Sequence, residues 1–126
     1  MELESLTESI IGAAIEVHRR LGPGFLESIY EKALILELHK RGLSVVSQKE
    51  LIIRYDRVEV GRQRLDLFVE DLVLVELKAV KKLEPVHFAV ARSYLRALER
   101  RHGLLMNFNK PTLEVRRVLN PYDSAS

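Results

Sequence analysis

Cysteine is absent from this chain of 126 residues, which excludes disulfide bonds, thiolate metal ligands and cysteine nucleophiles. A metal ion would therefore need carboxylate or histidine ligands. The chain also has no run of about 18 apolar residues, the length that a membrane-spanning helix requires. Its N-terminal residues are acidic and lack the basic and apolar regions of a secretory signal. We therefore expect a cytoplasmic protein without a membrane partner.

The chain also lacks a large excess of either charge. It has 20 Lys and Arg residues and 18 Asp and Glu residues, which give a formal net charge of +2. This mild excess permits nucleic-acid binding but does not require it. Apolar residues make up 47% of the chain and charged residues 30%, which is typical of a soluble globular protein rather than a disordered one. The length suits one compact core, so we predict a single domain over residues 1–126, with 120–126 as a frayed tail.

Hydrophobic periodicity predicts helices over residues 6–21, 25–41 and 85 to about 102. Alternation of apolar and polar residues predicts strands over 45–55, 63–69, 72–78, 104–108 and 113–119. The order ααβββαββ indicates an α/β fold with a central mixed β-sheet flanked by helices. Both faces of the hairpin formed by the second and third strands are largely apolar, so the sheet needs a helical layer on each side.

The predicted core takes one face of each element. In the second helix, Leu26 and Ile29 are expected to point inward. In the second strand, alternation places Leu65 and Leu67 on the same face. His18 lies on the apolar face of the first helix, where a hydrogen-bonded core histidine is a more common role than a functional one.

Charge inside an apolar strand is the strongest functional signal. The apolar run of residues 72–75 leads directly into Glu76-Leu77-Lys78. Because side chains alternate along a strand, Glu76 and Lys78 share one face. Burying a carboxylate and an ammonium group costs several kcal/mol unless partners compensate, so their position predicts a functional role.

Asp66 lies on the preceding strand, and the register of the hairpin decides whether it meets Glu76. A two-residue turn would place Asp66 opposite Val75, whereas a three-residue loop that includes Leu72 would place it opposite Glu76. We predict the second register, because it gathers four charged residues at one end of one sheet face. These are Arg64, Asp66, Glu76 and Lys78. A structural ion-pair network at the sheet end is the alternative to a functional site.

Two opposed carboxylates repel each other unless a cation lies between them. A hard divalent ion such as Mg2+, with Mn2+ as a substitute, accepts oxygen ligands, so Asp66, Glu76 and the backbone carbonyl of Leu77 are the predicted metal ligands. Lys78, on the same face, would position or deprotonate the attacking water and stabilise charge on a phosphate. The predicted reaction is hydrolysis of phosphodiester bonds in nucleic acid, and we expect the substrate to be DNA.

Asp66 followed by Glu76-Leu77-Lys78 resembles the Asp and Glu-x-Lys elements of the PD-(D/E)XK nuclease superfamily. Within it, the chain is similar to small proteins with a GxxExxY motif, which here is Gly24-Phe25-Leu26-Glu27-Ser28-Ile29-Tyr30. The resemblance covers nearly the whole chain. It implies a restriction-endonuclease-like core, in agreement with the fold inferred from the pattern of elements.

The same resemblance implies that Glu27 is a catalytic acid, brought into the metal site by an early helix. Glu31, one turn later, and Glu16, on the first helix, are alternative acids, and a capping role at the helix start is a further alternative. Val90 stands where similar proteins usually carry glutamine, one turn before Tyr94. This difference raises a second hypothesis, a catalytically inactive nuclease fold that binds nucleic acid or a protein partner.

Cations near the acids predict a surface that follows a phosphate backbone, because the acids alone would repel it. The predicted nucleic-acid-binding residues are Arg64, Lys81, Lys82, Arg92, Arg96 and Tyr94. A solvated helix face is the alternative for the arginines. A homodimer would allow a small domain to embrace a duplex, and an exposed edge over residues 55–60 would also suit a structural homo-oligomer.

Overall fold

The computed structural model describes residues 2–121, which form three helices and five strands. The helices are α1 (Leu3–Leu21), α2 (Glu27–Lys40) and α3 (Pro85–Leu98). The strands are β1 (Val45–Tyr55), β2 (Val58–Val69), β3 (Val73–Lys78), β4 (His102–Asn107) and β5 (Glu114–Leu119). This order confirms the predicted ααβββαββ arrangement, although β2 begins at Val58 rather than at residue 63.

The strands form a mixed sheet in the order β1-β2-β3-β4-β5. Neighbouring strands are antiparallel except β3 and β4, which are parallel. Two parallel strands need a long crossover connection, and α3 lies within it. Because β3 is the middle strand, its side chains are covered on both faces, which explains its continuous apolar run.

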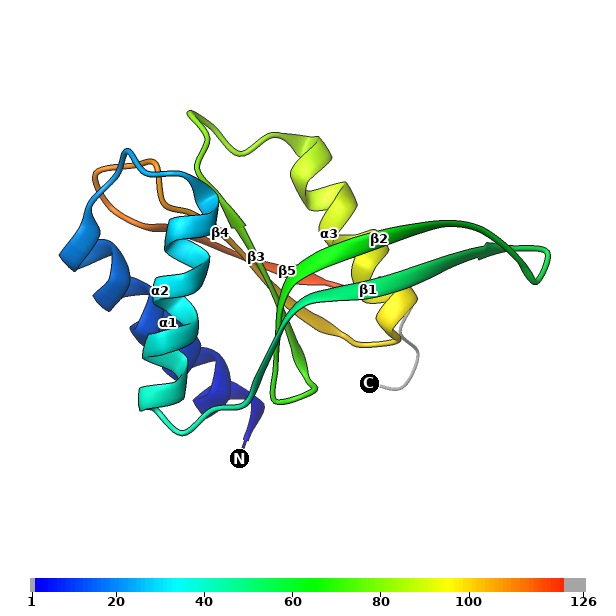
Figure 1. Cartoon of the computed structure of the whole chain (residues 1–126), viewed down its shortest axis with the longest axis horizontal. Helices are drawn as coiled ribbons and strands as arrows, with labels where there is room; N and C mark the ends of the chain where they lie inside the picture. Colours follow the sequence, from blue (N-terminus) through cyan, green and yellow to red (C-terminus); the bar gives the residue numbers. More distant parts are fainter. Residues whose placement is uncertain (1, 122–126) are drawn as a thin grey trace.

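The sheet separates α1 and α2 on one side from α3 on the other (Figure 1). The cluster under α1 and α2 includes Leu6, Ile10, Tyr30, Leu34, Leu38, Leu67, Val75, Leu77, Met106 and Phe108. The cluster under α3 includes Leu51, Leu65, Phe68, Leu74, Ala91, Leu95 and Leu105. Apolar side chains on both faces of the sheet thus account for a helical layer on each side, as predicted.

Tyr30 fixes the start of α2 against α1. Its hydroxyl donates to the carbonyl of Gly22 (2.6 Å) and accepts from the backbone N–H of Phe25 (3.1 Å), while its ring stacks on Phe108 with centroids 4.6 Å apart. The prediction that Leu26 points inward is wrong, because the helix begins only at Glu27 and Leu26 is 73% exposed. Ile29, also predicted to point inward, is 40% exposed although it lies within α2, so that prediction is wrong as well.

Hydrogen bonds also fix residues near the end of α1 and just after β5. His18 is buried, and its Nε2 lies 2.8 Å from the carbonyl oxygen of Lys110, so the predicted role as a satisfied core histidine is confirmed. Asn120, in the predicted frayed tail, is buried, and its backbone N–H donates to the carbonyl of Arg101 (2.9 Å). Residues 122–126 of that predicted tail lie outside the described residues.

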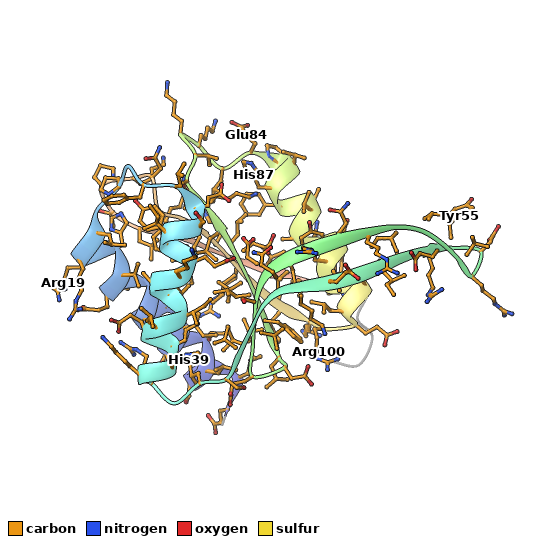
Figure 2. All side chains as sticks on the ribbon, in the orientation of Figure 1. Arg19, His39, Tyr55, Glu84, His87 and Arg100 are labelled. Atoms are coloured by element: carbon orange, nitrogen blue, oxygen red, sulfur yellow. The ribbon has the colours of Figure 1, made fainter. Side chains whose placement is uncertain are left out.

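The β1–β2 hairpin extends beyond the rest of the sheet as an arm (Figure 1). β2 pairs with β1 along nearly its whole length, but with β3 only from Leu67 to Val69. The arm closes in a two-residue turn at Asp56 and Arg57, whose left-handed backbone angles (φ 52° and 66°) match the twist of a tight hairpin. Tyr55 lies at its tip (Figure 2).

Candidate active site

The register between β2 and β3 is the one that brings Asp66 toward Glu76. Leu67 pairs with Val75 and Val69 with Val73, across a three-residue loop of residues 70–72. Both Glu70 and Asp71 in this loop have left-handed backbone angles (φ 53° and 55°). The predicted three-residue loop is therefore confirmed.

Two reciprocal hydrogen bonds join the acids where the backbone pairing of β2 and β3 ends. The backbone N–H of Asp66 donates to the Glu76 carboxylate (2.7 Å), and the backbone N–H of Leu77 donates to Oδ2 of Asp66 (2.9 Å). Side-chain oxygens thus take the place of the carbonyl oxygens that would continue the sheet. Each acid is held against the strand that carries the other, so the two carboxylates converge rather than point through opposite faces.

Gln48 on β1 is a part of this arrangement that the sequence analysis missed. The pairing of β1 with β2 skips one position, Gln48 opposite Asp66, and Gln48 has a left-handed backbone (φ 52°). Its side-chain amide donates to Oε1 of Glu31 on α2 (2.8 Å). A polar residue inside β1 was the only signal in the sequence, and polar residues are common in edge strands.

The pairing of β1 with β2 is interrupted at Gln48 and Asp66, and the two leucines that flank Asp66 pack on opposite sides of the sheet. Leu67 packs under α1 and α2, whereas Leu65 packs under α3. The predicted placement of both leucines on one face is therefore wrong. Strict alternation holds only along a regular strand, and the interrupted pair of Asp66 with Gln48, whose backbone is left-handed, lies between the two leucines.

The left-handed backbone of Gln48 leads to a prediction on stability. Gln48→Gly should unfold at a higher urea concentration than Gln48→Ala, with a free energy of unfolding about 1 kcal/mol larger, because only glycine adopts this conformation without strain. Both variants lose the amide, so the difference isolates the backbone. At the neighbouring Lys49 the same pair of substitutions should show the opposite order, since glycine weakens an extended strand. Equal stability of the two Gln48 variants would contradict the strained conformation.

Both acids have a raised pKa, and burial is the largest cause for each. Glu76 is 6% exposed, and burial, followed by the charge of Asp66, raises the pKa of Glu76 to about 8. Burial likewise raises the pKa of Asp66, while hydrogen bonds from the Leu77 backbone and the Gln48 side chain oppose the shift. The charge of Glu27 raises both pKa values and that of Lys78 lowers both, so these two residues lie within electrostatic reach of the acids.

The candidate acids of the two N-terminal helices differ in their surroundings. A cavity of about 210 Å³ is lined by Glu27, Ser28, Glu31, Gln48, Asp66 and Leu77. Burial raises the pKa of Glu31, whose carboxylate is already held by Gln48, whereas Glu27 is exposed at the start of α2. Glu16 forms ion pairs with Arg19 and Arg20 on α1 instead and does not line this cavity.

The donor set around the acids suits a hard divalent cation only in part. Among residues 2–121, no group of three or more His, Cys, Asp or Glu side chains is arranged to hold a metal ion. The oxygens that do converge belong to Asp66 and Glu76, and Mg2+ commonly uses one or two carboxylates with waters and substrate phosphate. Burial, and for Glu76 the charge of Asp66, disfavours the charged form of these carboxyls, and a cation between them would offset both effects, so the chemistry of the site fits such an ion.

The sequence profile of the PD-(D/E)XK nuclease superfamily matches residues 4–118. The chain belongs to this superfamily. Membership agrees with the restriction-endonuclease-like fold predicted from the sequence and makes the chain a nuclease-like domain. No curated protein and no solved structure matches the chain. Within residues 2–121, none of the helices combines the length and apolarity needed to span a membrane.

Tyr94 of this nuclease-like domain borders the acids from α3. Its hydroxyl donates to Oε1 of Gln63 on β2 (3.3 Å). Burial raises the pKa of Tyr94, and the charges of Glu76 and Asp66 raise it further. The predicted substrate-contacting tyrosine is thus near the acid pair, together with Gln63, which the sequence analysis did not single out.

The predicted cations surround the C-terminal end of β3 unevenly. Lys81 and Lys82 line a cavity of about 850 Å³ together with Lys110 and Arg116. The sequence analysis did not single out these last two cations, because Lys110 follows β4 and Arg116 lies in β5, far along the chain from Lys81. Arg92 lines a neighbouring cavity with Lys82.

The remaining residues are exposed or cap a helix. Arg64 is exposed on the arm opposite Glu50 of β1, beyond the last β2–β3 pair, and Arg96 is exposed on α3. His87 caps α3, because its Nδ1 accepts from the backbone N–H of Glu84 (2.9 Å), and the two residues lie together at the helix start (Figure 2).

Proposed function

We propose that this domain hydrolyses phosphodiester bonds of nucleic acid, with DNA as the substrate and with Mg2+, or Mn2+ in its place, as the cofactor. The observation that supports this most strongly is the reciprocal contact of Asp66 and Glu76, two carboxylates with raised pKa values beside Lys78. Such a pair is unfavourable without a nearby positive charge. A function that brings a metal cation to the two carboxylates explains why they are placed together.

Each residue of the site has a proposed role that follows from its position. Asp66, Glu76 and the Leu77 carbonyl are the proposed metal ligands, and Glu27 is the additional acid from α2. A divalent cation at this place would supply Lewis-acid stabilisation of the phosphate and lower the pKa of a bound water. Lys78 holds the attacking water and stabilises negative charge on the phosphate. Glu31 is held by Gln48, so we assign it to the support of Asp66 rather than to the ligand set.

The DNA backbone would follow the cations around the end of β3. The proposed contacts are Arg64, Lys81, Lys82, Arg92, Arg96 and Tyr94, to which Lys110 and Arg116 are added. Phosphate contacts from lysine and arginine make binding strongly salt-dependent, which is the expected signature of this surface. A homodimer that contacts both strands of a duplex stays a prediction.

A second candidate function is binding of nucleic acid without cleavage. It is favoured by Val90, which puts an apolar side chain one turn before Tyr94, where similar proteins usually carry glutamine. Under this alternative the fold and the cationic surface are kept while hydrolysis is lost.

A cleavage and binding assay on the full chain separates these functions. We expect labelled DNA to be cut in Mg2+ or Mn2+ and left intact in a chelator, and Asp66→Asn to abolish cutting. Asp71→Asn is the matched control, because it makes the same change at an exposed loop residue whose contact is a surface ion pair with Arg100. Salt-dependent binding with no cutting in either metal would support the second candidate, and absence of binding would reject both.

A further inference from the structure

An uncharged groove lies between α3 and the arm. Its volume is about 480 Å³, within the range of small-ligand sites, and its lining residues are Ile53, Gln63, Ala89, Val90, Ser93 and Tyr94. None of these residues carries a charge at neutral pH, in contrast to the acidic cavity lined by Glu27, Glu31 and Asp66. A phosphate or a metal ion would find no charged partner in the groove. A neutral, flat ligand needs none and suits these walls better.

Tyr94 connects the groove to the acid pair. It lines the groove, and the charges of Glu76 and Asp66 act on its hydroxyl and raise its pKa, after burial, the largest cause. Gln63, which also lines the groove and accepts a hydrogen bond from Tyr94, lies on β2 three residues before Asp66, so the groove begins near the acids and continues along the arm toward Ile53. A nucleotide whose phosphate lies at Asp66 would have its neighbouring bases within reach of this surface.

The groove also offers hydrogen-bonding groups that have no protein partner. Within the described part of the chain, neither the Ser93 hydroxyl nor the amide nitrogen of Gln63 makes a hydrogen bond, and the amide oxygen of Gln63 only accepts from Tyr94. Val90 and Ile53 supply apolar walls, and Tyr94 supplies an aromatic ring. Apolar walls with a few convergent polar groups suit a nucleobase, which stacks with its faces and forms hydrogen bonds with its edge.

We infer that this groove seats an unpaired base of the strand bound at Asp66 and Glu76, so that the domain acts on single-stranded nucleic acid or on unpaired ends rather than on intact duplex. The inference rests on the proposed function. In a duplex the bases are stacked and paired, and reaching the groove would require a base to leave the stack. Val90 has a direct role here, because an apolar side chain keeps the wall of the groove suited to a base.

The experiment compares two ligands that differ only in their bases. Binding of a labelled oligothymidylate and of an abasic oligonucleotide of the same length is measured by fluorescence anisotropy in a chelator, so that no cutting occurs. We expect the wild type to prefer the oligothymidylate by about 10-fold or more, because base–aromatic stacking contributes about 1–3 kcal/mol per base. Duplex DNA of the same length should bind less tightly than the oligothymidylate.

Three variants test the location. Tyr94→Ala and Val90→Glu should remove most of the preference for the oligothymidylate over the abasic strand, and Tyr94→Phe should retain it because the ring remains. Val86→Glu is the matched control, since Val86 lies one turn earlier on α3, is 59% exposed and does not line the groove. Circular dichroism of each variant shows that α3 is intact.

The outcomes separate the inference from the proposed function. Equal affinity of the wild type for both oligonucleotides would overturn the base-binding groove while nucleic-acid binding remained. Equal loss of the preference in Val90→Glu and Val86→Glu would overturn its location. Failure to bind any of the three ligands at low salt would reject the proposed function itself.

Discussion

Lys78→Ala should lower the rate constant of Mg2+-dependent DNA cleavage by about 10²–10⁴-fold, the usual contribution of a general acid or base. Lys78 ends β3 two residues after Glu76, and its charge lowers the pKa of both Glu76 and Asp66. Removing the ammonium group takes away both the group that holds the attacking water and the positive charge beside the acids. Single-turnover cleavage with saturating enzyme measures the rate constant of the cleavage step without product release.

A conservative replacement distinguishes the two roles of Lys78. Lys78→Arg keeps the positive charge but cannot give up a proton near neutral pH, so it should restore DNA affinity and only part of the rate. Lys40→Ala, at the exposed C-terminal end of α2, is the control and should cleave like the wild type. A Lys78→Ala variant that is folded and fully active would remove the proposed role of this residue.

Without divalent cations, the protein should lose stability as the pH rises from about 5 to about 8. In this window folded Glu76 keeps its proton, because its pKa is about 8, whereas the unfolded chain releases it near the ordinary value of 4.5. The folded state therefore binds more protons, and raising the pH favours unfolding. Each unit of pKa shift corresponds to about 1.4 kcal/mol, so the loss across the window should amount to a few kcal/mol.

Glu76→Gln tests this origin, because glutamine does not titrate but can still accept the hydrogen bond from the Asp66 backbone. The variant should be more stable than the wild type at pH 8, and its stability should depend less on pH. A smaller slope should remain from Asp66, whose pKa is raised in the same direction by burial. Urea unfolding at several pH values is the measurement, with the surface change Glu50→Gln as control.

Divalent cations add an independent readout to the same experiment. If Mg2+ binds to the folded acids, it should raise the free energy of unfolding of the wild type at pH 8 and have less effect on Glu76→Gln. The charged groups that act on Glu76 are Asp66 from β2, Glu27 from α2 and Lys78 on its own strand. An identical pH slope in the wild type and in Glu76→Gln would contradict the shifted pKa of Glu76.

The order of elements could be read from local patterns because each element is long enough to show its own period. The three-residue loop at residues 70–72 could also be predicted, since only one register gathered the charges at one end of a face. The inward orientation of Leu26 and the common face of Leu65 and Leu67 could not be predicted in the same way. The first failed because α2 begins only at Glu27, and the second failed beside the interrupted pairing of Gln48 with Asp66.

The sequence by itself determined the α/β order, the apolar strand that carries Glu76 and Lys78, and the superfamily likeness, because these depend on residues close together along the chain. Only the tertiary structure decided that Gln48 holds Glu31, that Gln63 meets Tyr94, and that Lys110 and Arg116 join Lys81 and Lys82. These partners come from different elements. Their meeting depends on the interrupted pairing at Gln48 and on the packing of helices against the sheet, which no local period encodes.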